Sequence, residues 1–263
     1  MRPKVLLATP THDGKAYCLE FWVRRVRAIQ KVTPCDVLMA DNSLGEGYAR
    51  QMRKLGIKVL RSPARDEPLQ SLAEARGKLY AYAIRHGYDY LFSLEQDLFP
   101  PPDILQYLLA MRQSVKSEHA VVAAPYLIKY LSRPEPPYHT VDQLTSVARD
   151  LILSERTKEP MQRLATGREM LANPGVERVF AAGLGCALVD VGILKRIKVR
   201  YSQATYQPDD AFFYLDLRDL DIPVYVDTRL IDKVIHISGN VHSVYGWWSM
   251  ASSVKHRRPK SAG

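Results

Sequence analysis

The feature that most constrains the fold is a regular alternation of short apolar runs and amphipathic helical patterns in the first half of the chain. Runs of strand length occur at residues 5–9, 37–40, 57–60, 90–94 and 120–128. Helical patterns, at residues 19–29, 48–55, 72–83 and 101–111, lie between them and present one apolar face each. Repeated strand–helix units predict an α/β fold whose mostly parallel central sheet is covered by helices on both faces.

Length and composition place the chain among ordinary globular proteins. With 263 residues and 46% apolar residues, it fits one α/β domain or two small ones. Its longest apolar runs fall short of the roughly 18 residues that a membrane span needs, and the run after Lys4 is too short for a signal peptide. Cys18, Cys35 and Cys186 are isolated and odd in number, which argues against a metal cluster or a disulfide framework. We therefore expect a cytoplasmic protein.

The alternation breaks near Ser132. Residues 132–175 are polar and charged, and we expect them to be partly helical and to form an insertion or lid on the main sheet. Apolar structure resumes at Val179, followed by a helix over residues 209–220 and a strand over residues 222–226. We expect one domain over residues 1–240 and a separate C-terminal segment, residues 241–263. The net charge is +9, and the basic tail either is a loose terminus or contacts an anionic membrane or nucleic acid.

Two carboxylates follow the apolar strand at residues 90–94. Glu95 and Asp97 are two positions apart, and such residues point to the same side of an extended chain. Ligands of open α/β sheets bind beyond the carboxyl ends of the strands. Paired oxygen ligands at that place suit Mg²⁺ or Mn²⁺ carrying a phosphorylated substrate. The alternative is an acidic turn in solvent.

Polar groups also follow other strands. Thr9-Pro10-Thr11 ends the first strand and Asp41 ends the second, which predicts a ligand crevice along one edge of the sheet. Arg76 and Lys78 flank a glycine early in a helix, where they could hold a diphosphate. A solvated basic face of the helix is the alternative.

The second half carries three further candidate groups. Gly183 and Gly185 lie in an apolar strand-like run, which indicates close approach of a ligand or, alternatively, a bulge or tight packing. Asp209 and Asp210 begin a helix, where one acid can cap the helix and the other can accept a proton. His236 could complete a metal site or serve a structural role.

Taken together and in this order, the motifs resemble those of glycosyltransferases of the GT-A fold, similar to family 2. The resemblance runs over Thr9-Pro10-Thr11, Asp41-Asn42-Ser43, Ala75-Arg76-Gly77-Lys78, Glu95-Gln96-Asp97 with its trailing prolines, Gly183-Leu184-Gly185, Asp209-Asp210-Ala211-Phe212-Phe213 and His236-Ile237. It spans residues 4 to 240. Glu95 stands where the family's signature has Asp, and Gly77 stands where the family usually has Asn.

The resemblance implies a three-layer, Rossmann-like GT-A catalytic domain. It also implies a metal-dependent, inverting transfer of sugar from a nucleotide-diphosphate donor, such as a UDP- or GDP-sugar, to an acceptor hydroxyl. Asp210 would be the general base, with Asp209 as the alternative, and Asp97 would bind Mn²⁺ or Mg²⁺ together with Glu95 and His236. The implied donor-binding residues are Thr9, Pro10, Thr11, Asp41, Arg76, Lys78, Glu95, Gln96, Gly183 and Gly185. Residues 132–174, which in this family shape the acceptor site, match none of its motifs.

Two other functions remain open. One is a GT-A-like module that binds nucleotide sugars without catalysis. The other is a sugar nucleotidyltransferase, but the glycine-rich loop that such enzymes carry after the first strand is replaced here by Thr9-Pro10-Thr11-His12-Asp13-Gly14. A nucleic-acid partner is not expected, because basic residues are not interleaved with stacking aromatics. Trp247-Trp248 and the basic tail make peripheral membrane contact a further hypothesis.

Overall fold

The structure, a computed structural model, describes residues 2–62, 64–128, 144–153, 160–204 and 207–237. Within these residues the main element is an eight-stranded sheet in the order β3-β2-β1-β4-β11-β6-β12-β9. Its strands are β1 (Val5–Thr11), β2 (Asp36–Asp41), β3 (Lys58–Arg61), β4 (Tyr90–Leu94), β6 (Val121–Ala123), β9 (Val176–Val179), β11 (Cys186–Asp190) and β12 (Val224–Asp227). The apolar runs of the first half therefore form strands, as the sequence predicts.

Strand direction gives the sheet one functional edge. β3, β2, β1 and β4 run parallel to one another, and β6 runs parallel to β12. β11 is antiparallel to both β4 and β6, and β9 is antiparallel to β12. Because β11 reverses direction between two neighbours, β6 and β12 point the same way as β1 and β4. The carboxyl ends of these parallel strands lie at a common edge, and the predicted mostly parallel sheet is confirmed. The sequence pattern does not predict the reversal at β11.

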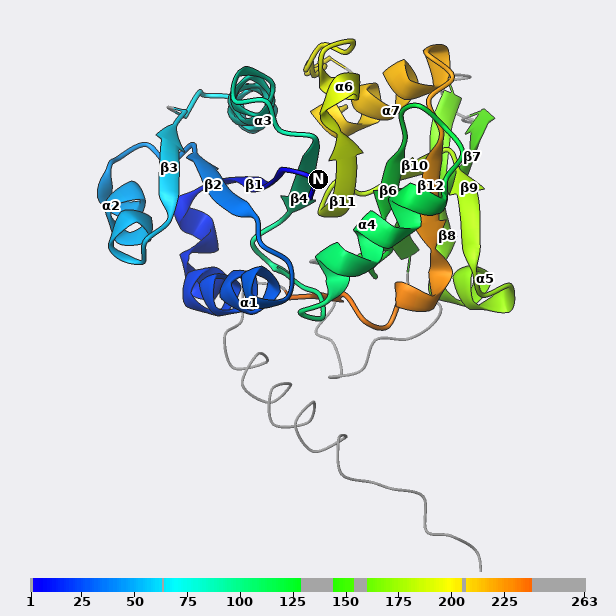
Figure 1. The fold of residues 1–263 in the computed structure, drawn as a ribbon. Coiled ribbons are helices and arrows are strands. Elements are labelled where there is room, and N and C mark those ends of the chain that lie inside the picture. The colour runs from blue at the N-terminus through cyan, green and yellow to red at the C-terminus, as the bar shows by residue number, and fades with distance from the viewer. Residues whose placement is uncertain (1, 63, 129–143, 154–159, 205–206, 238–263) are drawn as a thin grey trace, which may run out of the picture.

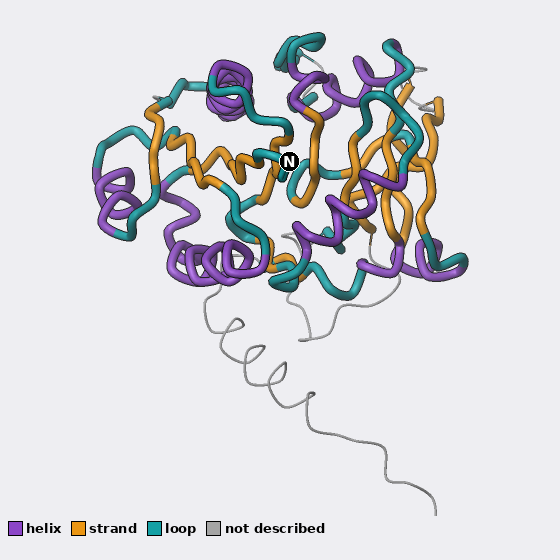
Figure 2. The backbone as a smooth tube through the Cα atoms, in the orientation of Figure 1, coloured by secondary structure: helices purple, strands orange, loops and turns teal. Residues whose placement is uncertain are grey.

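Helices cover both faces of this sheet. Leu6 and Ala8 of β1 belong to an apolar cluster with α3 (Pro68–Arg85), α6 (Val191–Leu194) and α7 (Asp209–Asp219). Val5 and Leu7 belong to a second cluster with α1 (Leu19–Val32), α2 (Gly47–Lys54) and α4 (Ile104–Ser114). Alternate residues of one strand thus face opposite layers. Figures 1 and 2 show α3, α6 and α7 along one side of the sheet and α1 along the other. The predicted three-layer α/β/α fold is confirmed.

The segment predicted to be partly helical, residues 132–175, contains a helix but is mostly strand in its described part. The described part of this segment is mainly a hairpin of β7 (Leu144–Leu153) and β8 (Pro160–Thr166), and its helix is the short α5 (Gly167–Ala172). β7 also pairs with β10 (Ala181–Ala182), which completes a three-stranded sheet within the described residues. Val147 and Ala148 of β7 are fully buried, whereas Arg149 and Arg163 are partly exposed and Asp150 is exposed. A strand with one wet face has a polar sequence, which is why composition suggested a helix. A role as lid stays a prediction.

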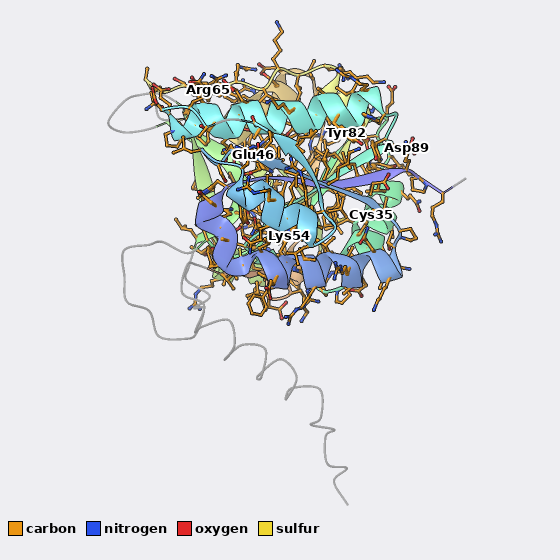
Figure 3. All side chains as sticks on the ribbon, turned by 90° about the vertical axis from the view of Figure 1, so that its left-hand side faces the viewer. Cys35, Glu46, Lys54, Arg65, Tyr82 and Asp89 are labelled. Atoms are coloured by element: carbon orange, nitrogen blue, oxygen red, sulfur yellow. The ribbon has the colours of Figure 1, made fainter. Side chains whose placement is uncertain are left out.

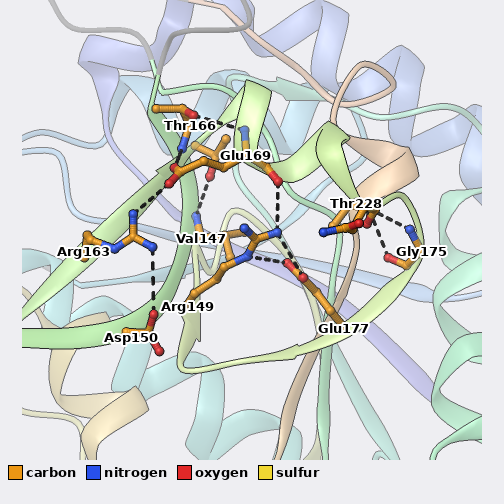
Figure 4. Close-up of polar contacts among 11 residues, drawn as sticks. Val147, Arg149, Asp150, Arg163, Thr166, Glu169, Gly175, Glu177 and Thr228 are labelled. Carbon is orange, nitrogen blue, oxygen red and sulfur yellow. Dashed lines mark hydrogen bonds and ion pairs between the residues drawn. The ribbon is translucent and has the colours of Figure 1, made fainter.

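Charged side chains fasten this second sheet to the main one (Figure 4). Arg149 of β7 donates to both carboxylate oxygens of Glu177 on β9, at 3.1 Å each, and to the carbonyl of Glu169 at 3.1 Å. Thr166 and Glu169 form a reciprocal capping box at the start of α5. Arg163 of β8 holds the same Glu169 carboxylate at 2.8 Å. Arg149, Arg163, Glu169 and Glu177 are thus paired across strands and helix.

The apolar run from Val179 onward is two strands rather than one. β10 belongs to the second sheet and β11 to the main sheet, so the chain changes sheets at Gly183-Leu184-Gly185. The predicted strand at residues 120–128 is likewise shorter, because β6 ends at Ala123 and Leu127 bridges to Thr145 in the second sheet. Local apolarity marks these segments as buried but does not say which sheet they join.

The remaining predictions concern the cysteines, membrane spans and the C-terminal segment. Cys18 and Cys186 are buried and Cys35 is half-buried, and all are thiols (Figure 3 labels Cys35). Burial raises the pKa of Cys35 to about 12, so that thiol is protonated at neutral pH. In the described part of the chain, no helix has the length and hydropathy of a membrane span. Trp247-Trp248 and the basic tail lie outside the described residues.

Candidate functional site

The predicted crevice residues meet at the carboxyl edge of the sheet. Thr11, at the end of β1, is in register with Asp41 at the end of β2. Glu95 follows β4 directly, and its amide donates to the carbonyl of Gly185 at 2.8 Å, immediately before β11. Four segments that are far apart in sequence therefore converge, because parallel strands bring their carboxyl ends together.

Asp41 is fully buried at this edge. Its Oδ1 accepts from the Ser43 amide at 2.9 Å and from the Ser43 hydroxyl at 2.6 Å, and its Oδ2 is ion-paired with Arg61. Arg61 also donates to the Ser43 carbonyl at 2.8 Å. These contacts fix the carboxylate in one orientation beside Thr11. Its predicted contact with a nucleotide base stays a prediction.

Gln96 has its contacts inside the protein. The side chain is fully buried, and its oxygen accepts from the hydroxyls of Thr11 and of Tyr48, the latter at 2.9 Å. Its amide nitrogen donates to the carbonyl of Lys15 at 2.7 Å. Gln96 thereby ties β1, α2 and the segment around Lys15 to the loop that carries Glu95 and Asp97. In this position it orients the two acids rather than facing the crevice.

Asp97 and His236 lie together because β13 (Ile235–His236) pairs with β5 (Leu98–Phe99), which sets His236 opposite Leu98. His236 Nε2 lies 3.5 Å from Asp97 Oδ2. Burial disfavours the charge on Asp97, but contact with His236 and the charge of Lys15 outweigh burial and lower the pKa of the carboxyl to about 2. Asp97 is therefore a carboxylate at neutral pH.

Lys15 is a site residue that the sequence motifs do not predict. It lies in the 3₁₀ helix η1 (Asp13–Cys18), just after β1, and its Nζ is 3.1 Å from Asp97 Oδ1 and 4.0 Å from Glu95 Oε2. Burial lowers the pKa of Lys15, but the charges of Glu95 and Asp97 outweigh it and raise the pKa, so Lys15 stays an ammonium. The sequence feature that could have identified Lys15 is its position five residues after Pro10, in a turn that follows a strand.

Asp97, Glu95 and His236 are the residues predicted to bind a metal ion. Across the described residues, no group of three or more His, Cys, Asp or Glu side chains is placed to hold a metal ion. Asp97 and His236 are adjacent, but the ammonium of Lys15 lies where a cation shared by Asp97 and Glu95 would sit. The residues as arranged do not fit a divalent ion, and its presence stays a prediction.

Arg76 and Asp209 form a buried ion pair. Arg76 Nε lies 2.5 Å from Asp209 Oδ2, and the two side chains are 5% and 1% exposed. Burial opposes the charge on Arg76, but Asp209 outweighs it and raises the pKa of the guanidinium. Arg76 lies well inside α3, which begins at Pro68, so the helix N-terminus does not contribute to a phosphate site there. The contact joins α3 to the start of α7, and it pairs the negative charge of Asp209 with the guanidinium of Arg76.

Lys78 is not brought to the same place as Arg76. Residues two apart on a helix point in different directions, and the exposed Lys78 donates from Nζ to the carbonyl of Arg61 at 2.7 Å. The predicted pair of cations around Gly77 is therefore split between the core and the surface.

Asp210 is more exposed than its neighbour Asp209, which is buried in the ion pair with Arg76. It is half-buried, and burial raises its pKa to about 6, with the negative charges of Asp209 and Glu95 adding to the shift and Arg76 opposing it. A carboxylate of this pKa is a suitable proton acceptor near neutral pH.

Tyr126 occupies the space left by the two glycines. A Cβ added at Gly183 or Gly185 would collide with the Tyr126 hydroxyl, and at Gly185 also with Leu98. The ring packs edge-on against His236, with centroids 5.7 Å apart. Burial and the charges of Glu95 and Asp210 raise the pKa of Tyr126 well above its usual value, so the phenol stays protonated among the acids. The close approach predicted at the glycines is made by this side chain.

We expect Gly185→Ala to destabilise the protein by about 1–3 kcal/mol, because the new methyl must displace Tyr126 or Leu98. Urea unfolding measures the change. Gly47→Ala is the matched control, because a Cβ there meets nothing within 4 Å. Equal stability of the two variants would contradict the packing of Tyr126 against Gly185.

Comparisons with known proteins concern the fold. No family model and no curated protein matches the chain. A solved structure titled as a mycobacterial protein is 15% identical, with 92% of this chain and 70% of that chain covered and a TM-score of 0.52. TarS of S. aureus is 13% identical, with 85% of this chain and 36% of that chain covered and a TM-score of 0.47. A CMP:2-keto-3-deoxy-manno-octonic acid synthetase complexed with CTP is 12% identical, with 97% and 100% covered and a TM-score of 0.49.

At these identities the likeness concerns the fold and not the chemistry. The sheet order, the two helical layers and the acids at the carboxyl edge agree with the fold expected from the motifs. The chain therefore has the GT-A-like, three-layer α/β fold that its motifs predict, and the mycobacterial protein has a similar fold.

Proposed function

We propose that the protein transfers a sugar from a nucleotide-diphosphate donor to an acceptor hydroxyl. The observation that carries this proposal is the presence of two unlike acids, Asp97 and Asp210, near the buried Tyr126, whose pKa both of them raise. Asp97 is held as a carboxylate in a charged cluster, whereas Asp210 has a pKa raised to about 6. Acids with divergent pKa values in one site suit different roles, here donor binding and proton acceptance.

In this proposal the nucleoside lies beside Asp41 and Thr11, and the diphosphate lies at the cluster of Lys15, Glu95 and Asp97. The acceptor oxygen attacks the anomeric carbon as Asp210 removes its proton. The bond from that carbon to the phosphate oxygen breaks, and the nucleoside diphosphate leaves with the bonding electrons. Attack from the face opposite the leaving group inverts the configuration at the anomeric carbon. UDP- and GDP-sugars are the donors we propose to test first.

The test is release of nucleoside diphosphate from a panel of nucleotide sugars. Transferase activity predicts slow hydrolysis of one donor even before the acceptor is known. Pyrophosphate release from a nucleoside triphosphate and a sugar phosphate would instead indicate a nucleotidyltransferase. Binding without turnover under every acceptor condition would indicate a module that has lost catalysis.

The pH dependence follows from Asp210. The base acts as a carboxylate, and its pKa is raised to about 6. We therefore expect kcat/KM to be constant above about pH 7 and to fall about tenfold for each pH unit below 6, as Asp210 becomes protonated. A profile that stays flat from pH 7 to pH 5 would rule out Asp210 as the base.

A further inference from the structure

We propose that the ammonium group of Lys15 is the cation that binds the donor's diphosphate, in the position that the motifs assign to a divalent metal. The inference deepens the proposed function and rests on it, because it concerns the same site. In this way the chain itself supplies the positive charge that a departing nucleoside diphosphate requires.

The carboxylate of Asp97 already has a nitrogen partner on each side. Lys15 Nζ lies 3.1 Å from its Oδ1, and His236 Nε2 lies 3.5 Å from its Oδ2. Both carboxylate oxygens thus face a nitrogen atom. Lys15 also lies 4.0 Å from Glu95, so it bridges the two acids as a metal ion would. A metal bound to Asp97 would have to displace one of these partners.

The cluster of Lys15, Glu95 and Asp97 is also accessible to a ligand. The side chains of Lys15, Glu95 and Asp97 are 23%, 28% and 12% exposed, so the cluster is open to a ligand on one side. An ammonium has three donors, and the hydrogen bond to Asp97 uses one of them. The others can reach phosphate oxygens, to which lysine binds as a point charge.

The two cations predicted from the motifs are committed elsewhere. Arg76 is 5% exposed and paired with Asp209. Lys78 donates to the carbonyl of Arg61 on the exposed side of α3. Of these three cations, Lys15 is the one that touches both acids of the Glu95-Gln96-Asp97 motif.

The experiment measures affinity for UDP, GDP, CDP, dTDP and ADP, and for the monophosphate of the base that binds best. Each titration is made in EDTA and again in Mn²⁺. We expect the wild-type protein to bind the diphosphate in EDTA, with an affinity that Mn²⁺ changes less than about threefold. We expect Lys15→Met to weaken diphosphate binding about 10- to 100-fold, as for loss of a hydrogen bond to a charged group, and to leave the monophosphate within about threefold.

Lys54→Met is the matched control. Lys54 is an exposed lysine at the end of α2 (labelled in Figure 3), so its loss removes the same charge away from the cluster. Its diphosphate affinity should match that of wild type. If Lys15→Met melts too low to titrate, Lys15→Met/Asp97→Asn keeps the local charge balance and should show the same selective loss.

Three results would overturn the inference. Wild-type binding that requires Mn²⁺ would assign the diphosphate to a metal, and unchanged affinity in both Lys15 variants would leave Lys15 as an internal counterion of Asp97. Either of these leaves the proposed function standing. Absence of binding by any nucleotide, with or without Mn²⁺, would overturn the proposed function and this inference together.

Discussion

Asp210→Asn is expected to lower kcat by about 10²- to 10⁴-fold, the range typical for loss of a general base. Asparagine has nearly the same shape but cannot accept the acceptor's proton. Because Asp210 is half-buried and its charge is disfavoured by burial, replacing it with a neutral group should not unfold the chain. Initial rates with a saturating donor measure the effect, and KM for the donor should change little.

Asp219→Asn is the control for this experiment. Asp219 lies on the same helix, α7, but is exposed and paired with its neighbour Arg218 at 2.7 Å. Its variant should keep the wild-type rate within about twofold, since surface ion pairs contribute little. An Asp210→Asn enzyme as fast as Asp219→Asn would remove Asp210 from the mechanism.

Arg76→Met is expected to destabilise the protein by about 3–5 kcal/mol, because it leaves Asp209 as a buried carboxylate without a counterion. The pair joins α3 to α7, so the loss should appear in the global unfolding transition. Urea unfolding at pH 7 measures it. Arg76→Met/Asp209→Leu, which removes both charges, should recover most of the lost stability.

The comparison is Arg200→Met, which breaks an ion pair at 2.6 Å between the exposed Arg200 and the half-buried Asp216, a pair that is far less buried than that of Arg76 and Asp209. An exposed pair contributes up to about 1 kcal/mol, so this variant should be only slightly destabilised. If Arg76→Met and Arg200→Met lost the same stability, the ion pair of Arg76 and Asp209 would not be buried in solution as it is in the structure.

The sequence predicts the parts of the site that depend on local pattern. The strand at Tyr90–Leu94 is apolar apart from Ser93 because both of its faces are buried, and its end fixes the position of Glu95. Asp41 falls beside Thr11 because parallel strands end at the same edge. These placements follow from periodicity and strand direction, and both can be read from one short stretch of chain.

The parts that local pattern does not reach depend on contacts between distant segments. The packing of α3 against α7 joins Arg76 to Asp209, and neither that contact nor the place of Lys15 beside Asp97 leaves a local pattern. His236 meets Asp97 through the pairing of β5 with β13, as the family resemblance implies. The hairpin of β7 and β8 was predicted as partly helical because its charged residues pair across strands on a partly exposed face.

A thermal-shift screen of UDP, GDP, CDP, dTDP and ADP, with and without Mn²⁺, tests the central claim most directly, with pyrophosphate alone as the control. A ligand at 100 times its Kd stabilises the native state by about 2.7 kcal/mol, which should raise Tm by roughly 5–10 °C for a chain of this size. The account predicts such a shift for the diphosphate of one base and a smaller one for pyrophosphate. No shift with any nucleotide would contradict a nucleotide-sugar site at the carboxyl edge of this sheet.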